Sequence, residues 1–164
     1  MGKADTPISK AELFGFLDEH RLAVVSTCDA RGKPQSALIY VVPTEDLELI
    51  FYTLQTARKC ENLQRDGRVS FVIGWPQEHD RTADQNSVQY EGIAEEQLGA
   101  ARDKAKERYL AGLPENSGMA NWPGLTFFRV RPAWIRYSSY GKPWRVEEMK
   151  FDCEPTRAPR RWRH

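Results

Sequence analysis

The sequence predicts a mainly β protein with flanking helices (an α+β fold), whose antiparallel strands form a closed or nearly closed barrel. Short runs rich in apolar, β-branched and aromatic residues recur along most of the chain, and such runs are typical of strands. Turn residues separate these runs at short intervals, which indicates antiparallel connections. Closing the sheet into a barrel would also remove the exposed edges at which strands pair with other chains.

Length and composition predict one compact domain, which we expect to span residues 1–153. The chain has 164 residues, of which 40% are hydrophobic and 29% are charged, as in an ordinary soluble protein. Residues 155–164 carry four arginines and no acidic residue, so we expect 154–164 to be a basic, flexible tail. The net charge of +1 gives no reason to expect a nucleic-acid or membrane partner.

The cysteines indicate a reducing compartment. Cys28, Cys60 and Cys153 are odd in number, far apart and without metal-ligand spacing, so we expect free thiols and no metal site. The chain shows no signal peptide and no apolar run of transmembrane length. These features together predict a cytoplasmic protein.

The first expected element is a helix that ends near His20. Ser9 and Glu12 form a capping box, and Ile8 and Leu13 form the hydrophobic staple that accompanies it. This helix is expected to serve packing alone. Its apolar face consists of Leu13, Phe14, Phe16 and Leu17.

Three strands joined by short turns follow, and we expect them to form an antiparallel meander. Gly32 ends the first turn at a position that favours a positive φ. Residues 43–46 form the second turn. The three strands are expected at 22–27, 35–42 and 47–54.

The second half of the chain predicts more strands and one longer helix. A helix over residues 98–113 is stopped by Pro114. Polar or irregular stretches at 75–86 and 115–124 are expected to be loops. The further strands are expected at 68–74, from Gln85 or Ser87 to Glu95, and at 125–131, 134–140 and 144–151.

Residues 51–67 change from a strand to a helix, and this change is the main functional signal. Helix formers begin at Ala57, with Thr56 as the expected N-cap and Gly67 as the expected C-cap glycine. Cys60 and Leu63 then fall on one apolar face. The sequence therefore predicts a helix over residues 57–66.

Arg58 and Lys59 lie in the first turn of that helix, where the helix dipole disfavours cations. A bound anion would remove the conflict, because the first backbone N–H groups of a helix are also free to donate. Both cations and the hydroxyl of Thr53 or Thr56 could then hold a phosphate. The alternative is that Arg58 and Lys59 are ordinary solvated residues.

Several motifs resemble the pyridoxamine 5′-phosphate oxidase-like proteins that bind flavin mononucleotide (FMN) and have a split β-barrel fold. The resemblance covers roughly residues 10–150. Its most specific part is the spacing from Tyr52-Thr53 to Arg58-Lys59. The other matching segments are Gly32-Lys33-Pro34-Gln35, Asn62-Leu63, Arg68-Val69-Ser70-Phe71, residues 88–92 and Phe128-Arg129-Val130.

The resemblance implies a non-covalent FMN site in which Arg58 and Lys59 clamp the phosphate. It implies a homodimer with the cofactor at the subunit interface. Trp122, Trp134 or Trp144 could cover the flavin ring, although packing in the core or in the dimer contact is the alternative for each. The remaining cofactor-binding residues that it implies are Ala37, Leu38 and Ile39 beside the ring, Tyr52 and Thr53 next to them, and Ser87 in place of a glutamine.

The chain also departs from the true oxidases. Ala57 stands in place of a serine, Ala37 in place of an arginine, and Val42 in place of a lysine that touches the substrate. Ser138 stands where those enzymes have a tryptophan, and their Arg-x-His pair is missing. The chain therefore resembles the general stress protein branch of the family more than the true pyridoxamine 5′-phosphate oxidases.

We therefore expect an FMN-dependent oxidoreductase that transfers electrons or hydride to or from a small molecule. Because the flavin carries the reaction, no catalytic side chain is assigned; His20, His79 and His164 are scattered, and nothing ties a cysteine to a histidine. One alternative is a non-catalytic flavin-binding or stress-response protein. Another is that the same fold binds a deazaflavin or haem.

Overall fold

The structure is a computed structural model that describes residues 7–74, 86–141 and 144–153. The loop expected at 75–86 therefore lies outside the described residues except for its last position. His79 and the tail at 154–164, with His164, lie outside them as well. Within the described ranges, no helix is both long and apolar enough to cross a membrane.

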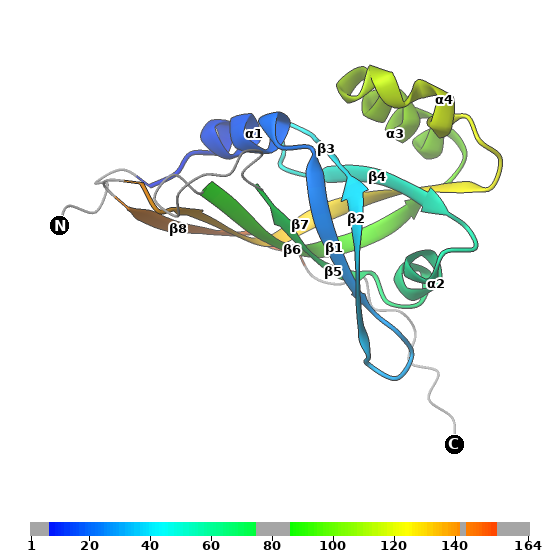
Figure 1. Ribbon diagram of the computed structural model, residues 1–164, viewed down its shortest axis with the longest axis horizontal. Coiled ribbons are helices and arrows are strands. Elements are labelled where there is room, and N and C mark those ends of the chain that lie inside the picture. The colour runs from blue at the N-terminus through cyan, green and yellow to red at the C-terminus, as the bar shows by residue number, and fades with distance from the viewer. Residues whose placement is uncertain (1–6, 75–85, 142–143, 154–164) are drawn as a thin grey trace.

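The strands form one eight-stranded antiparallel sheet in the order β2-β1-β5-β6-β7-β4-β3, with β8 on β7. The two ends of this path, β2 and β3, are separated in the chain only by Val41, so the sheet curls back on itself as a split barrel (Figure 1). The expected fold class is confirmed. The strands are β1 (Leu22–Cys28), β2 (Pro34–Tyr40), β3 (Val42–Pro43), β4 (Leu49–Leu54), β5 (Arg68–Ile73), β6 (Asn86–Gln97), β7 (Leu125–Ser139) and β8 (Arg145–Lys150).

Helices flank the barrel at three places (Figure 1). The first, α1, begins with the expected capping box, in which Ser9 Oγ accepts from the backbone N–H of Glu12 and the Glu12 carboxylate accepts from the backbone N–H of Ser9. Figure 1 shows α1 apart from α3 and α4, which lie together. The helices are α1 (Lys10–Glu19), α2 (Arg58–Arg65), α3 (Gly99–Gly112) and α4 (Ser117–Ala120), and a 3-10 turn, η2 (Pro114–Asn116), precedes α4.

Two hydrophobic clusters hold these layers together. The larger one fills the barrel around Phe51, whose ring stacks on Phe128 at 5.4 Å and meets Phe71 edge-on at 6.0 Å. The smaller one lies under α3 and joins Tyr109 to Phe127 of β7. The second cluster fixes α3 beside β4, where it becomes part of the site.

The expected meander is only partly right. The strand expected over 35–42 breaks at Val41, so that its first part pairs with β1 and its last part pairs with β4. The strand expected to start at Leu47 starts instead at Leu49, because Leu47 has a φ of +62° and closes the turn. This change of partner in the middle of one segment is what closes the barrel.

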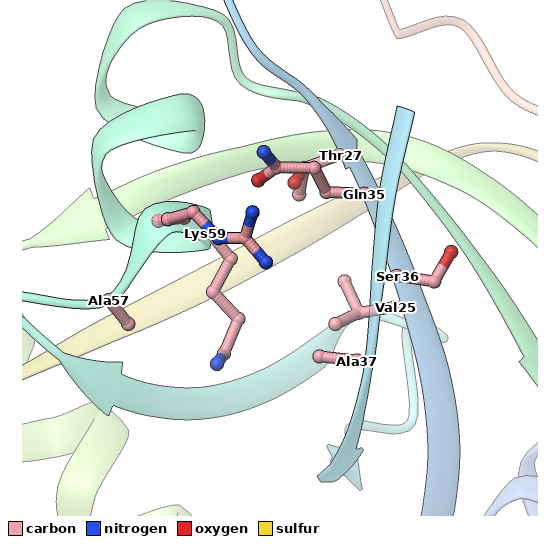
Figure 2. A pocket seen from close by; sticks show the side chains of 8 residues that line it. Val25, Thr27, Gln35, Ser36, Ala37, Ala57 and Lys59 are labelled. Carbon is pink, nitrogen blue, oxygen red and sulfur yellow. The ribbon is translucent and has the colours of Figure 1, made fainter. Parts of the chain in front are cut away.

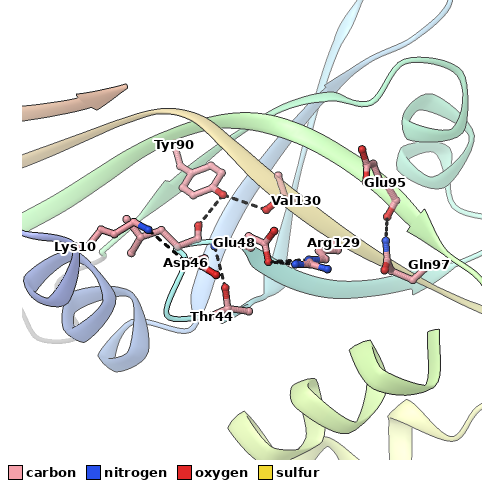
Figure 3. Close-up of polar contacts among 10 residues, drawn as sticks. Lys10, Thr44, Asp46, Glu48, Tyr90, Glu95, Gln97, Arg129 and Val130 are labelled. Carbon is pink, nitrogen blue, oxygen red and sulfur yellow. Dashed lines mark hydrogen bonds and ion pairs between the residues drawn. The ribbon is translucent and has the colours of Figure 1, made fainter. Parts of the chain in front are cut away.

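Leu47 is the one non-glycine residue with a positive φ in the described part of the chain. Its side chain is fully buried, and its carbonyl accepts a hydrogen bond of 2.9 Å from the Tyr90 hydroxyl. The same hydroxyl lies 3.3 Å from the carbonyl of Val130 (Figure 3). Burial and this bond hold a backbone conformation that costs a leucine about 1 kcal/mol or more.

Two of the expected helix boundaries at 57–66 are wrong. Ala57, rather than Thr56, is the N-cap of α2, and no side chain caps the helix. Gly67 does not have a positive φ; its backbone instead approaches β6 so closely that an added Cβ would lie 2.5 Å from the Ala94 carbonyl oxygen. The glycine therefore permits packing against β6 rather than ending the helix.

The second half shows two further corrections. The strands expected at 125–131 and 134–140 are a single strand, β7, because a register shift opposite Glu91 and Gly92 accommodates Pro132. The loop expected at 115–124 contains α4 and part of η2. The helix expected at 98–113 is confirmed as α3, with the exposed Leu98 as its N-cap.

Candidate functional site

The start of α2 faces the inner side of the β1–β2 hairpin across a small cavity. Its volume is about 250 Å³, and we call it the α2 pocket (Figure 2). The hairpin register places Val25 opposite Ala37 and Thr27 opposite Gln35, which directs alternate side chains toward the helix. The lining residues are Val25, Thr27, Gln35, Ser36, Ala37, Ala57, Arg58 and Lys59.

Arg58 and Lys59 are the first two residues of α2, as expected. Neither has an ion-pair partner among the described residues. Some other cations of the described chain do have a carboxylate partner, for example Arg68 with Asp66 at 2.6 Å. The α2 pocket therefore holds two cations whose charge no carboxylate of the described chain balances.

The backbone at the start of α2 adds donors to these cations. Ala57 provides no side-chain cap, and the N–H groups of Arg58 and Lys59 have no acceptor in the described part of the chain. Free N–H groups, the positive end of the helix dipole and two cations together favour an anion with several acceptor oxygens. A phosphate monoester fits this set of donors, whereas a neutral ligand would leave the charges unbalanced.

A buried asparagine, Asn62, bonds to two of the residues that line the α2 pocket. Asn62 lies one turn after Arg58 and is only 3% exposed. Its Nδ2 donates to Thr27 Oγ1 and to Gln35 Oε1, both at 3.0 Å. This network ties α2 to both strands of the hairpin, so the walls of the pocket have a fixed spacing.

A second cavity of about 250 Å³, which we call the aromatic pocket, adjoins the first and shares Ala57 and Lys59 with it. Its floor includes Tyr52, whose ring meets Tyr109 of α3 edge-on at 5.0 Å. Most of its lining is apolar or aromatic, which suits a planar ring. The lining residues are Leu38, Ile39, Tyr40, Tyr52, Thr53, Leu54, Ala57, Lys59, Tyr109 and Met119.

Tyr109 stays a neutral phenol in this wall. Burial raises the pKa of Tyr109 to about 12, against the lowering effect of a hydrogen bond from Asn116. Asn116 Nδ2 donates to the Tyr109 hydroxyl at 3.1 Å. Burial also raises the pKa of Tyr52, so neither tyrosine contributes an anion to the aromatic pocket near neutral pH.

The structure brings seven of the eight expected site residues together. Ala37, Arg58 and Lys59 line the α2 pocket, while Leu38, Ile39, Tyr52 and Thr53 line the aromatic pocket. Ser87 lines neither cavity. It is the second residue of β6, opposite Ser138 and next to Gly74.

The three tryptophans considered as ring covers also line neither pocket. Trp122 and Trp144 are exposed, at 58% and 48%, so neither packs in the core of this protomer. Trp134 is half-buried, and its Nε1 donates to a Glu148 carboxylate oxygen at 3.3 Å.

Sequence reasoning did not single out Thr27, Gln35, Asn62, Tyr109 or Met119 as site residues. A signal for Asn62 was present, because a residue four positions after Arg58 lies on the same helix face. Thr27 and Gln35 could be recognised only after the hairpin register was known. Nothing local in the sequence indicates that α3 and α4 reach the aromatic pocket.

The cysteines and His20 line neither the α2 pocket nor the aromatic pocket. Cys28, Cys60 and Cys153 are free thiols, as expected. Burial raises the pKa of the Cys60 thiol, which keeps it protonated. The described residues contain no cluster of three or more side chains able to hold a metal ion. His20 stacks on Phe16 with ring centroids 4.1 Å apart.

Comparison with known proteins identifies a matching family and several similar structures. The family model described as pyridoxamine 5′-phosphate oxidase matches residues 9–139. A pyridoxine/pyridoxamine 5′-phosphate oxidase of Ruegeria sp. (strain TM1040) is 29% identical over 59 residues, which make up 36% of this chain and 29% of that protein. The match thus spans less than a third of this relative.

Similar solved structures share the fold at low identity. A haem-binding protein from Mycobacterium smegmatis has a TM-score of 0.73 at 17% identity, with 88% of this chain and 59% of that chain covered. General stress protein 26 from Bacillus anthracis str. Sterne has a TM-score of 0.65 at 16% identity, covering 87% and 98%. HutZ, a haem storage protein from Vibrio cholerae, has a TM-score of 0.64 at 17% identity, covering 74% and 88%.

Proposed function

Because the chain belongs to the pyridoxamine 5′-phosphate oxidase family, we propose that it is an FMN-binding flavoprotein whose cofactor phosphate is held at the start of α2. One observation carries the proposal. Arg58 and Lys59 line the α2 pocket without a carboxylate partner in the described chain, at a helix end that already favours an anion.

The two adjoining cavities match the two parts of FMN. Arg58, Lys59 and the free N–H groups of α2 would hold the phosphate. The ring would lie in the aromatic pocket, against Tyr52 and Thr53 and beside the strand that contains Leu38. FMN would supply hydride or electron transfer, while the protein binds it, orients it and shields it from water.

The substrate is unlike that of the true oxidases. Val42 is 1% exposed and packs in the cluster under α3, so it cannot touch a ligand in either pocket. Ala37 adds no charge to the α2 pocket, and Ser138 is 6% exposed on β7. Once the cofactor phosphate occupies Arg58 and Lys59, neither pocket has a further cation for a phosphorylated substrate.

A homodimer with the cofactor at the interface completes the proposal. Among the described strands of one protomer, β2 pairs only with β1, which leaves its other edge beside the two pockets. Leu38 and Tyr40 on this strand are 61% and 49% exposed. Exposed apolar side chains at a strand edge favour association with another chain. Free thiols such as Cys28 are consistent with a cytoplasmic location.

Haem is the second ligand to consider, because similar structures are named as haem-binding or haem storage proteins. An absorption spectrum of the purified protein separates the ligands, since flavin, deazaflavin and haem absorb differently. We expect a flavin spectrum after reconstitution with FMN. A haem spectrum instead would contradict the proposal.

Titration with two flavins tests the phosphate site itself. FMN and riboflavin differ only by the phosphate, so a site built for the phosphate should bind FMN about tenfold or more tighter. Quenching of flavin fluorescence gives both dissociation constants. Equal constants would mean that the α2 pocket does not bind the phosphate.

Turnover distinguishes an enzyme from a flavin-binding protein without a reaction. We expect reduced nicotinamide to bleach the bound flavin, and an acceptor such as oxygen to restore its colour. A bound flavin that neither donor nor acceptor changes would favour the non-catalytic alternative.

A further inference from the structure

A buried hydrogen-bond network behind the α2 pocket fixes polar side chains of its wall, in addition to the two cations. Asn62 is 3% exposed, and its Nδ2 makes both of its hydrogen bonds to residues that line the pocket. A buried amide usually bonds to backbone or to structural neighbours. Here Thr27 and Gln35 receive the bonds, so Asn62 fixes two polar side chains of the cavity wall.

Gln35 is the more exposed of these two side chains. It is half-buried, whereas Thr27 is 4% exposed. Figure 2 shows the Gln35 side chain pointing from β2 toward the start of α2. Its Oε1 accepts from Asn62 at 3.0 Å, and its Nε2 has no acceptor in the described part of the chain.

Resting on the proposed function, we propose that Gln35 is a further phosphate-binding residue and that Asn62 is its positioning residue. A glutamine amide can present either its donor or its acceptor to a ligand. The bond from Asn62 occupies the acceptor, which leaves the Nε2 donor for the phosphate. Without that bond, the amide could rotate and turn its oxygen toward the anion, which is unfavourable.

The same hydrogen bond from Asn62 orients the Gln35 amide before the cofactor binds. A glutamine has several rotatable bonds, and fixing them on binding reduces affinity. Because Asn62 already holds the amide, little rotamer freedom is lost when the phosphate enters. The effect is specific to the phosphate, since the flavin ring would lie in the aromatic pocket, which Gln35 does not line.

The test measures the ratio of the riboflavin dissociation constant to the FMN dissociation constant. This ratio isolates the phosphate, because damage to the fold weakens both flavins alike. Gln35→Met removes the amide at similar length, and it should lower the ratio about five- to tenfold while the riboflavin constant stays within about twofold. Asn62→Ala should lower the ratio by no more than Gln35→Met does.

The double variant tests whether Asn62 acts through Gln35. In the Gln35→Met background, Asn62→Ala should leave the ratio unchanged, because no amide remains to be positioned. Gln64→Met is the matched control, because it makes the same substitution at an exposed glutamine of α2 that lines neither pocket. The Gln64 Nε2 donates to Glu96 Oε2 at 2.9 Å, so its removal should leave the ratio unchanged.

Two results would overturn the inference in distinguishable ways. If Gln35→Met leaves the ratio unchanged while Arg58→Ala lowers it, the phosphate binds at α2 but Gln35 does not contact it. If neither variant changes the ratio, the proposed function fails together with the inference. If the effects of Asn62→Ala and Gln35→Met add up in the double variant, Asn62 has no positioning role.

Discussion

Arg58 carries the clearest expectation at the level of single residues. It is exposed and unpaired in the described chain at the positive end of α2, so a phosphate should gain a charge-assisted contact of about 1.5–3 kcal/mol from it. Arg58→Ala should therefore raise the FMN dissociation constant about tenfold to a hundredfold. Flavin fluorescence titration measures the change.

Arg31 gives the charge-matched control for this variant. It lies exposed in the turn between β1 and β2 and lines neither pocket. Arg31→Ala should leave the FMN dissociation constant within about twofold, because Arg31 lines neither pocket and salt screens the field of an exposed charge. Equal effects of the two variants would point to overall charge rather than to a site at α2.

Tyr90 allows a stability prediction. Its hydroxyl is buried and donates to the carbonyl of Leu47 in the strained turn before β4 (Figure 3). Tyr90→Phe should lower the free energy of unfolding by about 1–3 kcal/mol, because the buried carbonyl loses its donor. Urea denaturation measures this loss. Tyr140→Phe is the control, since Tyr140 is 54% exposed.

Local sequence was enough to find some of these residues and insufficient for others. Arg58 and Lys59 stand out because their position conflicts with the helix dipole, which depends only on neighbouring residues. Gln35 and Asn62 meet across 27 positions, so their contact depends on the hairpin register and on how α2 packs. The positive φ of Leu47 is equally hidden, because the donor that supports it comes from β6.

At the level of elements, Gly67 shows how α2 is joined to the sheet. Its carbonyl accepts from the Ala94 backbone N–H at 2.7 Å, and an added Cβ would lie 2.5 Å from the Ala94 oxygen. Gly67→Ala should therefore lower the free energy of unfolding by about 1–3 kcal/mol through overpacking. Thermal or urea denaturation measures the loss.

Gly15→Ala is the control for Gly67→Ala, because the same substitution should have the opposite effect there. It lies inside α1, and an added Cβ would meet nothing within 4 Å. Gly15→Ala should raise the free energy of unfolding by about 0.5–1 kcal/mol, because alanine favours the helix. If both substitutions destabilised the protein equally, close packing of Gly67 on β6 could not be the cause.

The free energy of unfolding should depend on pH through Tyr109, which packs α3 against the sheet. Burial raises the pKa of Tyr109 to about 12, above the value near 10 of an unfolded chain. The folded state thus holds this proton more tightly, so its stabilisation is complete below about pH 10 and is lost as the pH rises through about 12.

The loss that Tyr109 causes should be about 3 kcal/mol in the free energy of unfolding between about pH 10 and 12. Tyr109→Phe removes the ionisable group, so the variant should lose less stability over this range than the parent protein. Urea denaturation at a series of pH values measures both slopes. If the free energy of unfolding falls with pH equally in both proteins, Tyr109 has the same pKa in the folded and the unfolded chain, and α3 does not bury it in solution.

Elements set by neighbouring residues could be predicted, and those set by distant contacts could not. The capping box of α1 needs only Ser9 and Glu12, and it was predicted correctly. The continuity of β7 through Pro132 depends on the register shift against β6, which no local pattern shows. The break at Val41 likewise depends on the two partners that β2 and β3 find.

At the level of the whole molecule, we expect association through the open edge of β2. The chain has a mass of 18.9 kDa, and sedimentation of the purified protein should give twice that value. Leu38→Glu places a charge on the exposed face of this strand, where Leu38 is 61% exposed, and it should shift the protein toward the monomer. A monomeric parent protein would contradict the expectation.

The fold class followed from strand and turn patterns because alternating apolar residues reflect the burial of a whole sheet. The identity of the ligand does not follow from the fold, since similar structures are named both as a general stress protein and as haem-binding or haem storage proteins. The FMN proposal rests instead on the pair Arg58 and Lys59 at the α2 pocket.

The most direct test of this account is a crystal structure of the protein soaked or co-crystallised with FMN. The account predicts electron density for the phosphate at the start of α2, within hydrogen-bond distance of Arg58 and Lys59, and for the ring against Tyr52. Density for FMN at another place, or an α2 pocket that stays free of phosphate at saturating FMN, would contradict it.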